Sequence, residues 1–401
     1  MRGGRADVRP QVVILSVLYS MEVSPMLKAL ATDATQRGAS VKFVTDELYR
    51  NRGALDVSGV AVSCLRPSWS RGILGLDVLR RHRLGRVALQ GFRKLDRAVM
   101  RLRLRRLHQG VQLCFAAEFF SLSLALEAGL NPQAIVYLSL EGINNCKTEK
   151  DMAIARRALP LCRAVCIASR ERADGLTAEL SLPTIQYVYL PVSWHKSRSA
   201  LAFSGSRAAG EVKLVYSGYF APWAQLRELV EAFAVASRQT AWTLTIHGHA
   251  MGTEDYLEQV ANLATEHANI SIDEAYYEDE RYLGFLSAFD LGVALYSKND
   301  GGSNWGNLSV SSGKIAAYCQ AGLAVVTNLN EALTQTAPFL HVAEIDGPSL
   351  LRAVQAYVAQ PEVYRESSLR LFDTVYDAAP LMQRLWTALG VPQLAHNPKD
   401  L

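Results

Sequence analysis

Residues 311–314, which read Ser-Ser-Gly-Lys, have the types and spacing of an anion-binding helix start. An apolar segment with helical periodicity follows them as far as Ala321-Gly322, and residues 323–327 then have the pattern of a short buried strand. The hydroxyls of Ser311 and Ser312 can accept hydrogen bonds from the unpaired amides of a first helical turn. Such a helix directs the positive end of its dipole, free N–H groups and the Lys314 ammonium toward one place, which favours phosphate.

The segment before this motif, residues 295–309, is rich in glycine and asparagine and follows a predicted strand that ends near Tyr296. In an α/β sheet a long loop at that point lies at the carboxyl edge, where ligands bind. The alternative is a capped surface helix with a solvated lysine. A nucleotide-triphosphatase P-loop is excluded, because that motif requires glycine where Leu308 stands and serine or threonine where Ile315 stands.

The length of 401 residues predicts two domains, and no apolar run approaches the ~18 residues that would span a bilayer. The basic start is followed by only about seven apolar residues, so we interpret it as a tip leading into the first strand rather than a secretory signal. Six scattered cysteines favour a reduced, cytoplasmic setting. Cys162 and Cys166 lack a second pair or a histidine cluster, so no zinc site is expected there.

The charge is distributed asymmetrically along the chain. Residues 1–195 carry 28 Lys and Arg against 16 Asp and Glu, a net charge of +12, whereas the remainder has 14 against 22, a net charge of −8. Eleven cations lie between Arg80 and Arg106 with a single acid, Asp96, and leucine and valine recur there at helical spacing. This region predicts a basic amphipathic helix that docks on an anionic membrane, or alternatively a core-packed helix with a solvated arginine face. Nucleic acid is not expected, because aromatic residues are not interleaved with the arginines.

Strands and helices alternate through the whole chain, which predicts an α/β protein with parallel sheets flanked by helices. The predicted strands are 11–17, 41–45, 60–65, 111–116, 134–140, 164–168, 185–190, 212–217, 242–247, 270–272, 291–295, 323–327 and 341–344. The polar residues 193–211 interrupt this order. We therefore predict a first domain over 1–192 with a basic amphipathic region at 75–108, a linker at 193–211, a second domain over 212–378, and a C-terminal helix and tail over 379–401.

Four segments in the second half resemble the donor domain of the GT-B glycosyltransferases. They are YSGYFAPWAQLRELVEAF at 216–233, LTIHGHAMG at 244–252, ISIDEAYYEDERYLGFLSAFDLGVALY at 270–296, and SSGKIAAYCQAGLAVV at 311–326. The resemblance covers most of residues 212–345, and the first half only in layout. It implies two Rossmann-like domains, with C-terminal helices that pack back toward the first domain.

The resemblance also implies a donor site. Lys314 would neutralise the diphosphate of a nucleotide-sugar, Gly218 would allow its close approach, and the backbone at 274–276 would hold the nucleobase. The implied donor-binding set is Gly218, Tyr219, His247, Gly248, Glu274, Ala275, Tyr276, Asn304, Ser311, Ser312, Gly313 and Lys314. No metal or further cofactor is expected, because the family that these segments resemble does not generally need a metal.

Two glutamates follow predicted strands of the first domain and are candidates for acid–base work. Glu141 is the first candidate to take the proton of an acceptor hydroxyl, and Glu118 is the second. The alternative for each is an acid at a helix N-terminus. The sequence departs from many relatives at Ala317, where they carry a glutamate that contacts the ribose or sugar.

The resulting prediction is a cytoplasmic glycosyltransferase, peripheral on the inner face of the membrane. It would transfer a sugar from a nucleotide-sugar to a hydroxyl of a lipid-linked saccharide, polysaccharide or glycolipid. The alternatives are a non-catalytic nucleotide-sugar-binding protein and a sugar epimerase or phosphorylase of the same fold.

Overall fold

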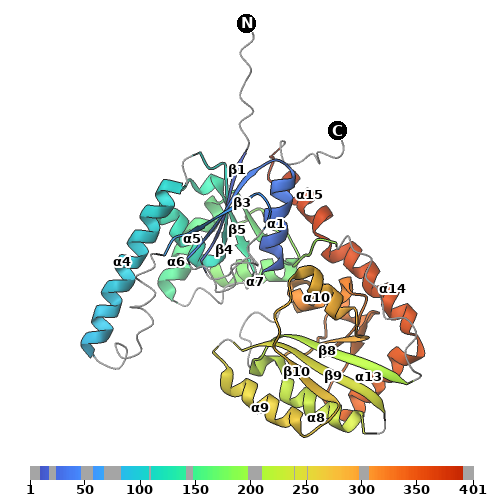
Figure 1. The fold of residues 1–401 in the computed structure, drawn as a ribbon. Helices are drawn as coiled ribbons and strands as arrows, with labels where there is room; N and C mark the ends of the chain where they lie inside the picture. Colours follow the sequence, from blue (N-terminus) through green and yellow to red (C-terminus); the bar gives the residue numbers. More distant parts are fainter. Residues whose placement is uncertain are drawn as a thin grey trace. The chain divides into compact units, whose positions relative to one another are not determined.

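The computed structural model describes residues 10–17, 24–46, 57–66, 83–107, 110–140, 148–196, 210–238, 240–250, 252–297 and 307–391. The chain divides into two compact units, the first within residues 1–190 and 379–401 and the second within 191–378. Figure 1 shows a sheet flanked by helices in each unit. The N-terminal tip, most of the linker, Glu141 and Asn304 lie outside the described residues.

The described strands of the first unit form a seven-stranded parallel sheet in the order β3-β2-β1-β4-β5-β6-β7. The central strands are continuous apolar runs, as burial on both faces of a parallel sheet requires. The seven strands of this sheet are β1 Gln11–Ser16, β2 Ser40–Thr45, β3 Val60–Cys64, β4 Leu113–Ala117, β5 Ile135–Ser139, β6 Ala164–Ile167 and β7 Tyr187–Tyr189.

Helices cover this sheet, and one of them comes from the C-terminal end of the chain. They are α1 Pro25–Gln36, α4 Arg83–Leu107, α5 Glu118–Glu127, α6 Glu149–Ala158, α7 Arg170–Leu180 and α15 Ala378–Ala388. In α15 the buried Trp386 donates its indole N–H to Asp33 Oδ2 at 2.6 Å and packs edge-on against Phe115. This contact confirms the prediction that the C-terminal helix packs back onto the first domain.

The described strands of the second unit form a six-stranded parallel sheet in the order β10-β9-β8-β11-β12-β13. They are β8 Glu211–Tyr219, β9 Ala241–His249, β10 Ile270–Asp273, β11 Leu291–Ala294, β12 Ala324–Thr327 and β13 Phe339–His341. The described helices are α8 Leu226–Ala236, α9 Glu254–Thr265, α10 Asp279–Leu286, α11 Leu308–Ser311, α12 Gly313–Gln320, α13 Gly347–Ala359 and α14 Pro361–Leu371, with a short 3-10 helix η5 Pro222–Ala224.

The last strand is displaced from its predicted position at 341–344. Phe339 and Leu340 pair with Val325 and Val326 of β12, whereas Glu344 is exposed to solvent. The apolar residues Phe339 and Leu340 therefore determine where the chain joins the sheet. The predicted strand at 341–344 was placed too far along the chain.

Each sheet has one point at which the strand order reverses direction. That point lies between β1 and β4 in the first unit and between β8 and β11 in the second. In open parallel sheets ligands bind outside the carboxyl ends of the strands at this position. The ends of β8 and β11 are therefore the first place to look for a site in the second unit.

Candidate functional site

Lys314 lies at the reversal point of the second sheet, where three aromatic rings surround its ammonium. Its Nζ is 4.3 Å from the ring centroid of Tyr216, 5.1 Å from that of Tyr296 and 5.2 Å from that of Trp223. Tyr216 belongs to β8, Tyr296 follows β11, and Trp223 lies in η5. We call these three residues the lysine cage. The elements on both sides of the reversal point thus contribute to one cation site.

The lysine cage contains a charge that the described residues do not neutralise. The Lys314 ammonium is buried, and no described residue accepts a hydrogen bond from it. Burial lowers the pKa of Lys314 from its ordinary value of 10.5 to about 7. Cation–π contacts are worth about 0.5–2 kcal/mol each, whereas a buried charge normally requires a paired and hydrogen-bonded counterion. The arrangement has the properties of a receptor for an anion.

Two glycines lie at the paired ends of β8 and β9, and one of them is beside Lys314. Gly218 and Gly248 are register partners on β8 and β9. A Cβ added to Gly218 would lie 2.9 Å from Tyr216 Oη and 3.4 Å from Lys314 Cε, so Gly218 lies directly beside the lysine side chain. A Cβ on Gly248, whose φ is +142°, would lie 1.8 Å from the Gly218 carbonyl oxygen. Glycine at position 248 therefore allows the two strand ends to lie this close together, and glycine at position 218 leaves room for the side chains of Tyr216 and Lys314.

The serines before Lys314 do not cap its helix with their side chains, so this part of the sequence interpretation was wrong. The short helix α11 precedes α12 and turns the chain, so that Ser312 Oγ accepts from Tyr296 Oη at 2.6 Å and Ser311 Oγ donates to the Asn307 carbonyl at 3.1 Å. The side chain of Ser312 therefore holds a cage residue in place. The first turn of α12, which begins at Gly313, has no side-chain cap.

Sequence reasoning missed Glu331, which follows β12 in the chain and caps the N-terminus of α11. Its carboxylate accepts from the Leu308 N–H at 2.6 Å and the Ser309 N–H at 2.9 Å, and also from the Ser309 hydroxyl. The local signal was a capping box of Glu331 with Thr334, which is recognisable in the sequence only as a helix start.

His247 is buried, and both of its ring nitrogens are hydrogen-bonded within the second unit. Its Nδ1 lies 2.8 Å from Ser217 Oγ and its Nε2 lies 2.9 Å from the Ala275 carbonyl oxygen. A carbonyl only accepts, so Nε2 carries the proton and Nδ1 accepts from Ser217. Burial lowers the pKa of His247, which keeps the ring neutral. His247 therefore offers no free nitrogen to a ligand or metal, and within the described ranges no cluster of three His, Cys, Asp or Glu side chains could hold a metal ion.

The segment 274–276 is exposed, but its backbone is fixed from both sides. Ala275 donates its N–H to Asp273 Oδ1 at 2.9 Å and accepts at its carbonyl from His247. Tyr277 Oη donates to Asp273 Oδ2 at 2.8 Å. Both polar backbone groups of Ala275 are thus engaged within the protein, and the side chains of Glu274 and Tyr276 lie toward solvent.

In the first unit, Glu118 occupies the equivalent reversal point at the end of β4. It is fully buried, and its φ of +64° is unusual for a residue with a side chain. Its Oε1 accepts from the Leu140 N–H at 2.6 Å, while Arg172 donates to the Leu140 carbonyl at 2.9 Å. The carboxylate of Glu118 therefore fixes the end of β5, the residue before Glu141.

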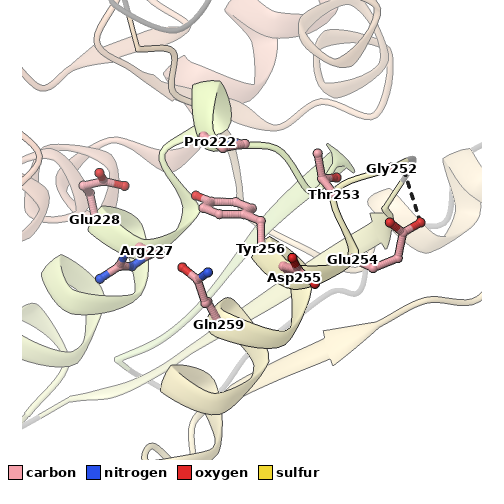
Figure 2. Close-up of a pocket in the computed structure, with 9 residues that line it drawn as sticks. All are labelled: Pro222, Arg227, Glu228, Gly252, Thr253, Glu254, Asp255, Tyr256 and Gln259. Carbon is pink, nitrogen blue, oxygen red and sulfur yellow. Dashed lines mark hydrogen bonds between the residues drawn. The ribbon is translucent and has the colours of Figure 1, made fainter. Parts of the chain in front are cut away.

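A cavity of about 490 Å³ lies between the starts of α8 and α9, away from Lys314. Figure 2 shows that Tyr256 and Arg227 line it together with the carboxylates of Glu228, Glu254 and Asp255. Tyr256 Oη accepts from the Leu226 N–H, and Glu254 from the Gly252 N–H. Three acids against one arginine make this cavity unsuitable for a diphosphate.

The sequence matches no protein-family model and no curated protein. The structure is similar to that of HepE from Anabaena in complex with UDP and glucose, with 12% identity and a TM-score of 0.69 over 95% of this chain and 99% of that chain. It is also similar to trehalose-6-phosphate synthase OtsA, with 10% identity and a TM-score of 0.68 over 95% and 99% of the two chains. A third similar structure is sucrose-phosphate synthase from Thermosynechococcus elongatus, with 14% identity and a TM-score of 0.64 over 96% and 99%.

These likenesses extend over nearly the whole length of each chain, and they confirm that this protein has the two-domain GT-B fold. The first half of the chain, which resembled the fold only in layout, is included in the match. Because the identities are low, the likeness is one of fold, and the site must be interpreted from its own residues.

We predict that Gly218→Ala weakens the binding of inorganic pyrophosphate at least tenfold, measured by calorimetry. The new methyl group would contact Tyr216 Oη and Lys314 Cε and narrow the approach to the ammonium. The matched control is Gly284→Ala on α10, where a Cβ meets no atom within 4 Å. Unchanged pyrophosphate affinity in Gly218→Ala would show that the anion does not approach Lys314 past this strand end.

Proposed function

We propose that this protein is a glycosyltransferase that binds a nucleotide-diphosphate sugar in its second unit. The observation that carries this proposal is the buried Lys314 ammonium at the reversal point of a GT-B fold, which has no hydrogen-bond acceptor among the described residues. Two of the similar structures contain UDP with glucose or UDP-glucose, a ligand class whose diphosphate could pair with this ammonium.

In the proposed reaction the bond between the sugar carbon and the diphosphate oxygen breaks, and a bond from that carbon to the acceptor oxygen forms. Negative charge develops on the departing nucleotide, beside the Lys314 ammonium. A fixed cation in a site with little water stabilises that charge strongly. The uncapped first turn of α12, including Gly313, adds N–H groups near the same place.

The acceptor would bind to the first unit, and its hydroxyl proton would pass to a carboxylate at the carboxyl edge of that sheet. Glu141 remains the first candidate for this base and Glu118 the second. Glu118 is fully buried and accepts a hydrogen bond from the Leu140 N–H, which supports a role in fixing the backbone of Leu140, the residue before Glu141 in the sequence.

The basic first half supports an acceptor that is anionic or lipid-linked, such as a lipid-linked saccharide, polysaccharide or glycolipid. Helix α4 packs Met100 and Leu104 into the core, while Leu95 and Leu102 on its outer side are 50% and 52% exposed. The cations Lys94 and Arg106 are exposed beside them. None of the described helices has the length and apolar character needed to cross a bilayer. We propose that this face of α4 docks on an anionic membrane surface.

For the donor site, we expect Lys314→Met to weaken ligand binding while it stabilises the protein. Removing a buried charge with no counterion should raise the free energy of unfolding at pH 6 by about 2–5 kcal/mol. Loss of the charged contact should weaken UDP binding about 10–150-fold. Thermal melts with UDP-, GDP- and dTDP-sugars, with wild type and variant compared, measure both effects.

The same panel separates an enzyme from a binding protein. A transferase releases free nucleotide from one donor in the presence of an acceptor, and Lys314→Met loses that release. Selective binding without any turnover would favour the non-catalytic alternative. Absence of stabilisation by every nucleotide-sugar would contradict the donor site itself.

The pKa of Lys314 predicts that donor binding takes up a proton. In the free protein the ammonium titrates near pH 7, below its ordinary 10.5, so burial destabilises the charged form and stability rises with pH between these values. A bound diphosphate favours the charged form. At pH 8.5, calorimetry of UDP binding in buffers of different ionisation enthalpy should therefore show uptake of about one proton. Lys314→Met should show none, and equal values for both proteins would contradict this assignment.

Membrane docking predicts co-sedimentation with vesicles that contain phosphatidylglycerol but not with pure phosphatidylcholine, and release by salt. The double substitution Leu95→Glu and Leu102→Glu should abolish this co-sedimentation. The matched control is Val358→Glu on α13, an apolar residue that is 49% exposed. Docking does not occur through α4 if the double variant sediments like wild type.

A further inference from the structure

A directed chain of hydrogen bonds runs from α10 through the end of β8 to the exposed segment 274–276. Tyr282 Oη donates to Ser217 Oγ at 2.9 Å, Ser217 Oγ donates to His247 Nδ1 at 2.8 Å, and His247 Nε2 donates to the Ala275 carbonyl at 2.9 Å. Tyr318 Oη also accepts from the Ser217 N–H at 2.8 Å. Every donor in this chain has one acceptor, so it has a single consistent arrangement of protons.

This chain connects the two parts of the proposed donor site. Ser217 directly precedes Gly218, which lies beside the Lys314 side chain. Ala275 is the centre of the segment 274–276, and Asp273 holds it from the other side. Beyond the strand pairing of β8, β9 and β10, the side chain of His247 joins the end of β8 to the residues after β10.

The surroundings of His247 explain why the bridge is rigid. The ring is packed against Phe285 at 4.8 Å and Tyr277 at 5.2 Å between ring centroids. The side chain is thus fixed by apolar contacts on its faces and by hydrogen bonds at both nitrogens. Its two hydrogen bonds join residues of different elements, Ser217 at the end of β8 and Ala275 after β10.

We infer that His247 is a positioning residue for nucleoside recognition, which fixes the segment 274–276 relative to the strand end beside Lys314. The inference rests on the proposed function of this site. It assigns to His247 an indirect role, in which the imidazole fixes the Ala275 backbone and leaves the neighbouring groups of Glu274 and Tyr276 to face the ligand. Its loss should therefore affect the nucleoside part of a ligand and leave the diphosphate part unchanged.

Two substitutions at this position separate hydrogen bonding from packing. His247→Phe keeps an aromatic ring beside Tyr277 and Phe285 but removes both hydrogen bonds. His247→Gln loses the ring but keeps an N–H that can reach the Ala275 carbonyl. We expect the Phe variant to bind UDP about tenfold more weakly than wild type, with pyrophosphate affinity within about twofold. The Gln variant should recover most of the UDP affinity.

Ser217→Ala provides a second variant with a small change in volume, in case His247→Phe does not fold. It removes the donor to Nδ1 and should also weaken UDP binding while sparing pyrophosphate. The matched control is Thr245→Val. Thr245 lies in β9, as His247 does, and its hydroxyl is 3.1 Å from Ser271 Oγ of β10. This control should bind both probes like wild type.

The outcomes distinguish the inference from the proposed function. If wild type binds neither UDP nor pyrophosphate, the proposed donor site fails. If wild type binds UDP but the Phe and Ala variants bind it equally well, the positioning role of His247 is wrong. Equal weakening of both probes would also overturn it, because that result indicates general damage to the fold rather than loss of nucleoside recognition.

Discussion

A buried ammonium group with no hydrogen-bond acceptor among the described residues is the constraint on which the candidate site of the second unit depends. Desolvating the Lys314 charge costs on the order of 5 kcal/mol, judged from its lowered pKa. The cage of Tyr216, Trp223 and Tyr296 offsets only part of this cost. A protein that was selected for stability alone would place an apolar side chain at this position. This cost is the physical basis for proposing that Lys314 binds an anionic ligand.

The parts around the lysine are rigid because each is fixed by more than one element. Gly218 and Gly248 allow β8 and β9 to run side by side to their ends, and Ser312 holds the hydroxyl of Tyr296. Glu331 fixes the short helix before α12. A preformed site of this kind loses little conformational entropy when it binds, which favours affinity.

The first unit uses a different kind of constraint at the same topological position. Glu118 is held in a left-handed backbone conformation that costs a residue with a side chain about 1–2 kcal/mol. Its carboxylate and the guanidinium of Arg172 together fix Leu140. The basic helix α4 adds a charged face to this unit, whereas the second half of the chain is acidic. The two units thus differ in electrostatics although both are doubly wound parallel sheets.

The sequence by itself determined the α/β fold and most strand and helix positions, and it selected Lys314 as the candidate anion-binding residue. Burial of parallel strands on both faces leaves continuous apolar runs that can be recognised in isolation, and four segments in order indicated the GT-B fold. Tertiary structure alone decided what surrounds the lysine, because Tyr216, Trp223 and Tyr296 are brought together by the reversal of strand order. It also decided that Ser311 and Ser312 bond to other partners and that His247 fixes Ala275. Hydrogen bonds between residues distant in sequence leave no periodic pattern, so only the folded chain shows which of the possible partners each polar group takes.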